Sequence, residues 1–185
     1  MRERSDEDLM KAWADGSMEA FETLYSRHRA PLYRYLLRLA GDEAGANDLY
    51  QGAWEKVIAA RRKLPKGAPF RAWLFRIAHN HAMDHFRRRR PETGLESETL
   101  AASSPGPAEE VSTAEQQQSL ESAIRSLPAD QRDALLLKLD GGLDLDEIAR
   151  VTGVGRETVK SRLRYAVKKL KRTMAPDSTE MNHEH

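Results

Sequence analysis

The stretch that decides the fold lies at residues 143–172 and reads LDLDEIARVTGVGRETVKSRLRYAVKKLKR. Asp144 is followed three residues later by Glu147, which predicts a capping box at the start of a short helix. Gly153 stands where the chain must turn, and a longer helix follows Gly155. The apolar stripe of that helix comprises Val159, Leu163, Ala166, Val167 and Leu170. A short capped helix, a turn and a longer helix together indicate a helix-turn-helix.

The longer helix also carries a basic face. Opposite the apolar stripe lie Arg156, Lys160, Ser161, Arg164 and Lys168. Residues near the start of such a helix can reach base edges in the major groove, while later ones meet phosphate. An ordinary helical hairpin with a solvated charged face is the alternative. The coincidence of cap, turn, apolar stripe and basic face favours DNA binding.

The charge distribution points to the same kind of partner. The net charge is only +1, but residues 61–90 hold ten basic side chains and a single acid, Asp84. Residues 91–124 hold seven glutamates and no Lys or Arg, and residues 155–172 hold eight basic side chains against one acid. Two basic blocks separated by an acidic spacer suit a polyanionic partner.

The remaining patterns predict an all-α protein with two helical domains. Residues 1–90 form the first domain, in which four helices are expected, the third over about residues 42–62 and the fourth over about residues 70–89. Pro31 should kink or divide the second helix. Residues 91–112 are rich in Pro, Gly, Ser, Thr and Glu, and this composition indicates a flexible acidic linker. Residues 113–174 form the helix-turn-helix domain, and residues 175–185 are a tail without a recognisable motif.

Composition excludes several classes of protein. The chain has no cysteine, which excludes a disulfide framework, a thiolate metal site and a cysteine nucleophile. The first ten residues are charged and lack the apolar core of a signal peptide. No apolar run approaches the ~18 residues that a membrane span needs. We therefore expect a soluble intracellular protein.

Both domains resemble those of bacterial sigma factors of the extracytoplasmic-function class. Residues 127–171, LPADQRDALLLKLDGGLDLDEIARVTGVGRETVKSRLRYAVKKLK, resemble the promoter-binding domain of that class. Residues 20–57, AFETLYSRHRAPLYRYLLRLAGDEAGANDLYQGAWEKV, resemble its polymerase-binding half, and residues 70–90, FRAWLFRIAHNHAMDHFRRRR, resemble its promoter-opening half. The two domains occur in the family's order over nearly the whole chain.

The resemblance implies a contact with the clamp helices of the largest subunit of core RNA polymerase. The matching residues are Asp48, Leu49, Gln51 and Trp54. Leu49 and Trp54 could equally be core residues. Gly52 departs from the family pattern, which usually has Glu there, and Gly inside a helix costs about 1 kcal/mol relative to Ala. Either the polymerase contact is weaker at Gly52, or a partner approaches the backbone closely there.

The resemblance also implies contacts with two promoter elements. The residues matched to the −10 element, which is read as a melted single strand, are Trp73, Asn80, Asp84, Arg87 and Arg88. The residues matched to the double-stranded −35 element are Arg156, Thr158, Lys160, Ser161, Arg162 and Arg164. For Trp73, packing inside the domain is the alternative role.

Three histidines in the segment IAHNHAMDHFRRRR, residues 77–90, raise a competing hypothesis. His81 and His85 are four residues apart and could share a helix face with Asp84, as in a metal-dependent hydrolase. No third ligand has a recognisable spacing, and the H-E-x-x-H signature is missing. We expect no metal and no cofactor. His79 should point to another side of the helix than His81 and His85, and we expect the three histidines to line a helix that faces DNA.

The sequence therefore predicts a promoter-specificity subunit of RNA polymerase that has no catalytic activity of its own. A stand-alone helix-turn-helix regulator is the alternative. The resemblance further implies an anti-sigma factor, which could hold this otherwise cytoplasmic protein at the membrane.

Overall fold

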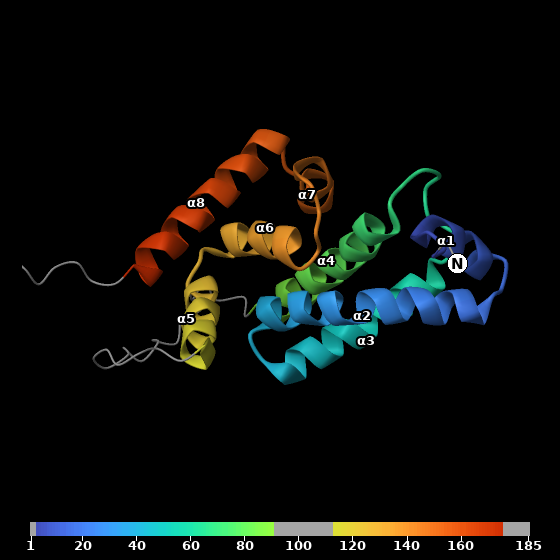
Figure 1. The fold of residues 1–185 in the computed structure, drawn as a ribbon, viewed down its shortest axis with the longest axis horizontal. Coiled ribbons are helices and arrows are strands. Elements are labelled where there is room, and N and C mark those ends of the chain that lie inside the picture. The colour runs from blue at the N-terminus through green and yellow to red at the C-terminus, as the bar shows by residue number, and fades with distance from the viewer. Residues whose placement is uncertain (1–2, 91–112, 176–185) are drawn as a thin grey trace, which may run out of the picture.

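A computed structural model describes residues 3–90 and 113–175. All the regular secondary structure in this part of the chain is α-helical, which confirms the all-α prediction (Figure 1). The expected linker and nearly all of the expected tail lie outside the described residues. Within those residues, no helix combines the length and the apolar character needed to cross a membrane.

The first two helices begin at the serines that cap them. Helix α1 (Asp6–Ala14) follows Ser5, whose hydroxyl accepts a hydrogen bond from the Asp8 N–H at 3.2 Å. Helix α2 (Met18–Ala40) follows Ser17 and ends at Gly41, where φ is 84°. Of the two expectations for Pro31, a kink or a division, the division is wrong, because α2 continues through Pro31. Packing of buried residues on both sides of Pro31, among them Leu24 and Leu36, holds the two halves of α2 together.

Helices α3 and α4 complete the N-terminal domain. Helix α3 (Glu43–Ala59) begins at Asp42, which caps the Gly45 N–H at 2.7 Å, and ends three residues earlier than the pattern suggested. Helix α4 (Phe70–Arg89) has the bounds expected from the sequence. Helix α2 packs against α1 and α3, and α3 also packs against α4. This arrangement leaves one side of α3 and the last turns of α4 free for other contacts.

The C-terminal domain is formed by α5 (Thr113–Arg125), α6 (Ala129–Leu139), α7 (Leu145–Thr152) and α8 (Arg156–Met174). Both hydrogen bonds of the capping box between Asp144 and Glu147 are present, at 2.8 and 2.9 Å. Gly153 ends α7 with φ 74°, a conformation that favours glycine. The predicted helix-turn-helix is thus confirmed. Val167 is an exception to the predicted apolar stripe, because it is 41% exposed.

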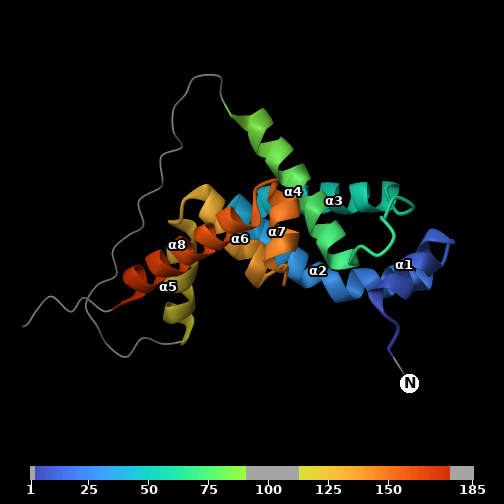
Figure 2. The ribbon, with the colours of Figure 1, turned by 90° about the horizontal axis from the view of Figure 1, so that it is seen from above.

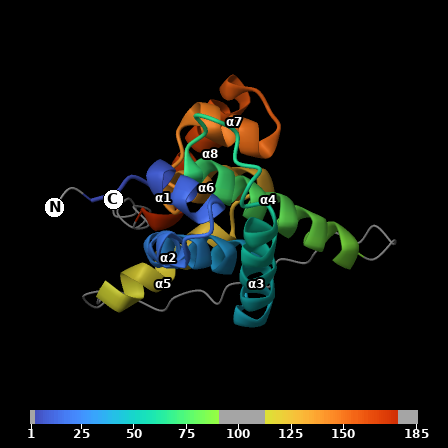
Figure 3. The same ribbon diagram turned by 90° about the vertical axis from the view of Figure 1, so that its right-hand side faces the viewer.

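The two domains pack against each other. Helix α6 lies between α8 and α2, and α7 lies on α4 (Figure 1). Seen from the side, α6, α7 and α8 lie over the N-terminal helices, α5 lies beside α2, and the end of α4 projects away from the body (Figure 3). The buried apolar residues of both domains form one connected cluster among the described residues.

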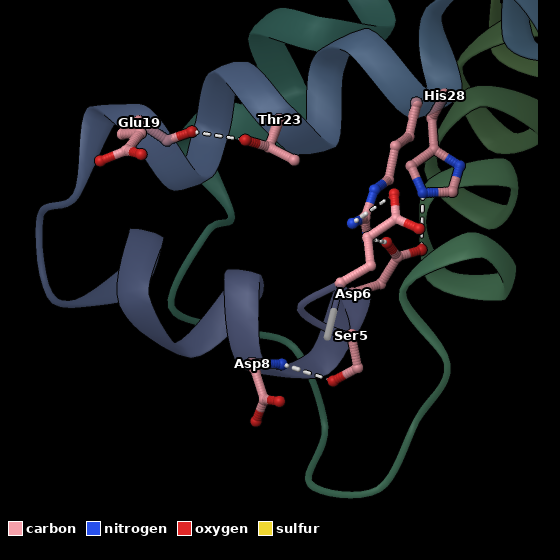
Figure 4. Close-up of polar contacts among 8 residues, drawn as sticks. Ser5, Asp6, Asp8, Glu19, Thr23 and His28 are labelled. Carbon is pink, nitrogen blue, oxygen red and sulfur yellow. Dashed lines mark hydrogen bonds and ion pairs between the residues drawn. The ribbon is translucent and has the colours of Figure 1, made fainter. Parts of the chain in front are cut away.

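A buried histidine joins the start of α1 to the middle of α2. The Asp6 carboxylate lies 2.7 Å from Nε2 of His28 and accepts a hydrogen bond from Arg27 at 2.8 Å (Figure 4). Burial lowers the pKa of His28 by more than the Asp6 carboxylate raises it. Burial alone would raise the pKa of Asp6, but Arg27 and His28 outweigh it and lower that pKa. His28 is therefore held neutral and Asp6 ionised.

This pairing predicts how stability depends on pH. Because the folded-state pKa of His28 lies below the usual ~6.5, the unfolded chain takes up the proton first, and stability falls as pH drops through that range. The lowered pKa of Asp6 adds a loss only below about pH 4. Urea unfolding at about pH 7.5 and about pH 5 should therefore give a lower free energy of unfolding at the lower pH. The drop should be smaller in His28→Gln, and an equal drop in both proteins would contradict this role of His28.

Candidate nucleic-acid interface

The basic face of α8 is exposed where the sequence placed it. Arg156, Lys160 and Arg164 are four residues apart and all exposed, as is Thr158. The Nε of Arg156 lies 3.2 Å from Asp146 Oδ1 in α7, which ties the start of α8 to the preceding helix. Side chains spaced by four residues share one helix face. This face can present long hydrogen-bond donors to a DNA groove.

The remaining two residues predicted for the −35 contact are less available. Ser161 and Arg162 are half-buried. The guanidinium of Arg162 lies 3.5 Å from Asp130 Oδ2 at the start of α6, and its side chain is only 23% exposed. Arg162 therefore turns toward the domain itself, away from the face of Lys160 and Arg164.

The last turns of α4 form a second basic surface. Asn80, Arg87 and Arg88 are exposed, and Arg87 donates a hydrogen bond to Asp84 at 2.7 Å. This end of the helix extends beyond the packed body, so three arginines of the last turn have solvent around them (Figure 2). Trp73 lies near the opposite end of α4, half-buried, with its ring 6.0 Å from that of Phe70. Packing is thus part of the role of Trp73.

The three histidines of α4 have different surroundings. His79 is 7% exposed and its Nδ1 lies 3.2 Å from Asp133 Oδ2, so it points into the protein, on another side of α4 than His81 and His85, as expected. Burial and the charge of Lys56 lower the pKa of the half-buried His81. The ring of the half-buried His85 lies 5.9 Å from that of Phe86. Among the described residues no group of three or more His, Asp or Glu is placed to hold a metal ion.

The four residues predicted to contact polymerase divide into two pairs. Asp48 and Gln51 are exposed on α3. Leu49 is fully buried and Trp54 is 6% exposed, so both are core residues. The ring of Trp54 lies 4.9 Å from that of Tyr25 and 6.1 Å from that of Phe21, which fixes α3 against α2. Any contribution of Leu49 and Trp54 to binding acts through the position of α3.

Two further residues share the exposed stripe of α3. Glu55 and Ile58 follow Asp48 and Gln51 at helical spacing, and Ile58 is 41% exposed although it is apolar. Gln51 donates a hydrogen bond to Glu55 at 3.3 Å. We define Asp48, Gln51, Glu55 and Ile58 as the α3 stripe. Their spacing of 3, 4 and 3 residues places all four on one helix face, so this stripe can be predicted from the sequence.

The structure also explains why residue 52 is a glycine. The group that lies close to its backbone belongs to the same chain. A methyl group added at Gly52 would collide with Nε2 of His81 in α4 and would lie 2.8 Å from its Cε1. Glycine therefore lets α3 and α4 approach closely at this point, which offsets its poor helix propensity. Of the two alternatives for Gly52, the close approach is present, but His81 of the same chain makes it in place of a partner.

Comparison with known proteins identifies the chain. Residues 24–92 match the family model for sigma-70 region 2, and residues 117–170 match the model for sigma-70 region 4. The sigma factor SigL of Mycobacterium tuberculosis, named as an extracytoplasmic-function sigma factor, is 35% identical over 82% of this chain and 86% of its own length. CarQ of Myxococcus xanthus, an RNA polymerase sigma factor, is 30% identical over 88% of this chain and 93% of its own length.

A solved structure has the same fold. CnrH, determined in complex with the cytosolic domain of CnrY, matches with a TM-score of 0.70 and 26% identity, over 95% of this chain and 100% of CnrH. Together with the two family models, these likenesses define a promoter-recognising initiation factor built of helices. The chain belongs to the extracytoplasmic-function class of sigma factors.

The contact between Gly52 and His81 yields a double-mutant test. Gly52→Ala should destabilise the otherwise unchanged chain, because overpacking typically costs about 1–3 kcal/mol and exceeds the gain in helix propensity. In a His81→Ala background the same substitution should stabilise the chain by up to about 1 kcal/mol. Unfolding free energies of the four proteins, measured in urea, give the coupling. Equal effects of Gly52→Ala in both backgrounds would contradict the proximity of the two residues.

Proposed function

We propose that this sigma factor divides its contacts among three exposed helix faces. The α3 stripe binds the clamp helices of core RNA polymerase, the end of α4 binds the melted −10 strand, and the basic face of α8 reads the −35 duplex. The observation that carries the proposal is that these three faces are exposed while the residues behind them are buried. The chain itself supplies no catalytic step and works in the cytoplasm with the polymerase.

The α3 stripe has the composition of a protein-binding surface. Asp48 and Glu55 supply carboxylates and Gln51 an amide, which can accept hydrogen bonds from arginines of a partner coiled coil. Ile58 adds exposed apolar area at one end. The aromatic packing of Trp54 keeps the helix rigid, so little conformational entropy is lost when a partner binds.

The C-terminal half of α4, from Asn80 to Arg89, suits a single strand. The exposed amide of Asn80 offers a donor and an acceptor, which matches the edge of an unpaired base. Arg87 and Arg88 can contact phosphates or stack on bases. Asp84 accepts a hydrogen bond from Arg87 and thereby orients its guanidinium along the helix.

An anti-sigma factor is a further proposed partner. CnrH was solved with the cytosolic domain of CnrY, and the sigma factor RpoE of Bartonella quintana was solved with the anti-sigma factor NepR. The latter matches this chain with a TM-score of 0.70 and 25% identity over 86% of it. We propose that a comparable protein masks the exposed faces described above, and that such a partner could hold the sigma factor at the membrane.

The polymerase contact is tested by reversing one charge. Asp48→Arg should weaken binding to core RNA polymerase by at least about tenfold, since it places a cation where a carboxylate meets the partner. Glu7→Arg, an equally exposed charge reversal on α1, is the control and should bind normally. Binding is measured with labelled protein titrated with core enzyme. Tight binding by Asp48→Arg would contradict the proposed surface, and failure of the unmodified chain to bind would favour a stand-alone regulator.

The two faces of α8 predict different salt dependences. Holoenzyme carrying Lys160→Ala or Arg164→Ala should bind promoter duplex more weakly, and each lost phosphate contact should lower the slope of log K against log salt by about 0.9. Arg162→Gln removes the same charge from the side that faces Asp130 and should change the slope much less. Titrations at several salt concentrations give the slopes. An effect of Arg162→Gln equal to that of Arg164→Ala would contradict the assignment of faces.

A further inference from the structure

An apolar groove lies where α1, the start of α2 and the end of α3 meet. Helices α2 and α3 run antiparallel, so the first turn of α2 lies beside the last turn of α3 (Figure 1). The groove has a volume of about 290 Å³. Its lining comprises Trp13, Gly16, Met18, Phe21, Ile58 and Arg61. Four of these six residues are large and apolar, and Arg61 alone carries a charge.

Aromatic rings form the wall of the groove. The ring of Trp13 lies 4.8 Å from that of Phe21. The ring of Phe21 lies in turn 6.1 Å from that of Trp54, edge to face, so the wall belongs to the aromatic packing that fixes α3 against α2. A side chain that enters the groove would therefore meet a preformed surface, and little conformational entropy would be lost in shaping it.

Two exposed apolar side chains form the rim of the groove. Met18 is 63% exposed and Ile58 is 41% exposed, although both are large and apolar. Only six large apolar side chains of the described residues are exposed to this degree, and these two line the same groove. Single apolar residues on a surface are ordinary, but neighbouring ones around a groove indicate an interaction site.

The groove continues the α3 stripe. Ile58 is the last residue of the stripe and also lines the groove. Asp48 and Ile58 are ten residues apart, which corresponds to about 15 Å along a helix. A partner helix that lies along the stripe would cover it with about three turns, and its next turn would reach the groove. The helical clamp of core RNA polymerase, the partner proposed for the stripe, therefore suits the groove as well.

The charges along this surface define the chemistry of the occupant. Asp48 and Glu55 place carboxylates on the stripe, whereas Arg61 lines the groove. A complementary helix would carry arginines or amides over the stripe, and a large apolar side chain next to a carboxylate at the groove. The volume of the groove lies just below the range of about 300–1,000 Å³ that is typical of small-molecule sites. A protein side chain therefore fits it better than a cofactor.

We propose that this groove is a second subsite for core RNA polymerase, which binds a large apolar side chain of the clamp helices beside the α3 stripe. The inference rests on the proposed function, because it assumes that the stripe contacts those helices. Met18 and Phe21 supply apolar area that is buried on binding, while the stripe supplies hydrogen bonds and charge. Apolar anchors in preformed pockets carry a large part of the binding free energy, so loss of the groove should weaken binding severalfold.

The rim residue Met18 allows a test that leaves the fold intact, because its side chain lies largely in solvent. Met18→Lys should weaken binding to core RNA polymerase by about fivefold to tenfold, since it puts an ammonium group at an apolar contact. Met18→Leu keeps the apolar character and should bind within about twofold of the unmodified chain. Met174→Lys, at the end of α8, makes the same substitution at another exposed methionine and is the matched control. Circular dichroism and urea unfolding should be unchanged in all three variants.

Oxidation of Met18 reports the same contact without any substitution. Hydrogen peroxide transfers one oxygen atom to the thioether, which yields the sulfoxide and water. Burial of Met18 in the holoenzyme should slow this reaction by at least about threefold relative to the free chain, as measured by mass spectrometry. In a mixture of core polymerase and Asp48→Arg, at a concentration where this variant does not bind, Met18 should react as in the free chain.

Three results would overturn the subsite. They are equal binding of core polymerase by Met18→Lys and the unmodified chain, undiminished oxidation of Met18 in a holoenzyme that has formed, and an equal loss of binding in Met174→Lys. The last result would show a general effect of surface lysines. Failure of the unmodified chain to bind core polymerase would instead count against the proposed function itself.

Discussion

The packing of one short helix, α6, determines how the rest of this molecule is arranged. Five consecutive residues, Asp133 to Leu137, are buried, so α6 needs cover on more than one side. Helices α7 and α8 cover it from within its own domain, and α2 covers it from the other. Because Asp133 is a carboxylate, the second contact must also supply hydrogen bonds, which Tyr35 provides. The packing of the two domains against each other therefore covers the buried side of α6 and supplies a hydrogen bond to Asp133.

The contacts within each domain differ in kind from the contacts between them. Inside the N-terminal domain, large apolar and aromatic side chains such as Leu49, Trp54 and Phe75 fix the helices against one another. Between the domains, polar contacts such as Tyr35 with Asp133 and Arg38 with Glu121 accompany the apolar packing, and water can replace hydrogen bonds when such a surface opens. Interfaces of this mixed character suit domains that move relative to each other.

The sequence predicted local structure well because the signals are local. The capping box at Asp144, the turn at Gly153 and the bounds of α4 each depend on residues within a few positions. It could not show that His79 turns inward or that Arg162 faces Asp130, since both depend on tertiary neighbours. The hydrogen bond between Tyr35 and Asp133 joins residues 98 positions apart, and neither residue type signals it. At Gly52 the sequence left a weaker polymerase contact and a close approach as alternatives, and only the packing of α3 on α4 identifies His81 as the neighbour.

The central claim, that the chain binds core RNA polymerase through the α3 stripe, can be measured directly by cross-linking. The chain has no cysteine, so a photoactivatable cross-linker can be attached at Gln51→Cys on the stripe or at Glu7→Cys on α1, both exposed positions. The account predicts a cross-link from Gln51→Cys to the clamp helices of the largest polymerase subunit and none from Glu7→Cys. Absence of the Gln51→Cys cross-link in an active holoenzyme would contradict it.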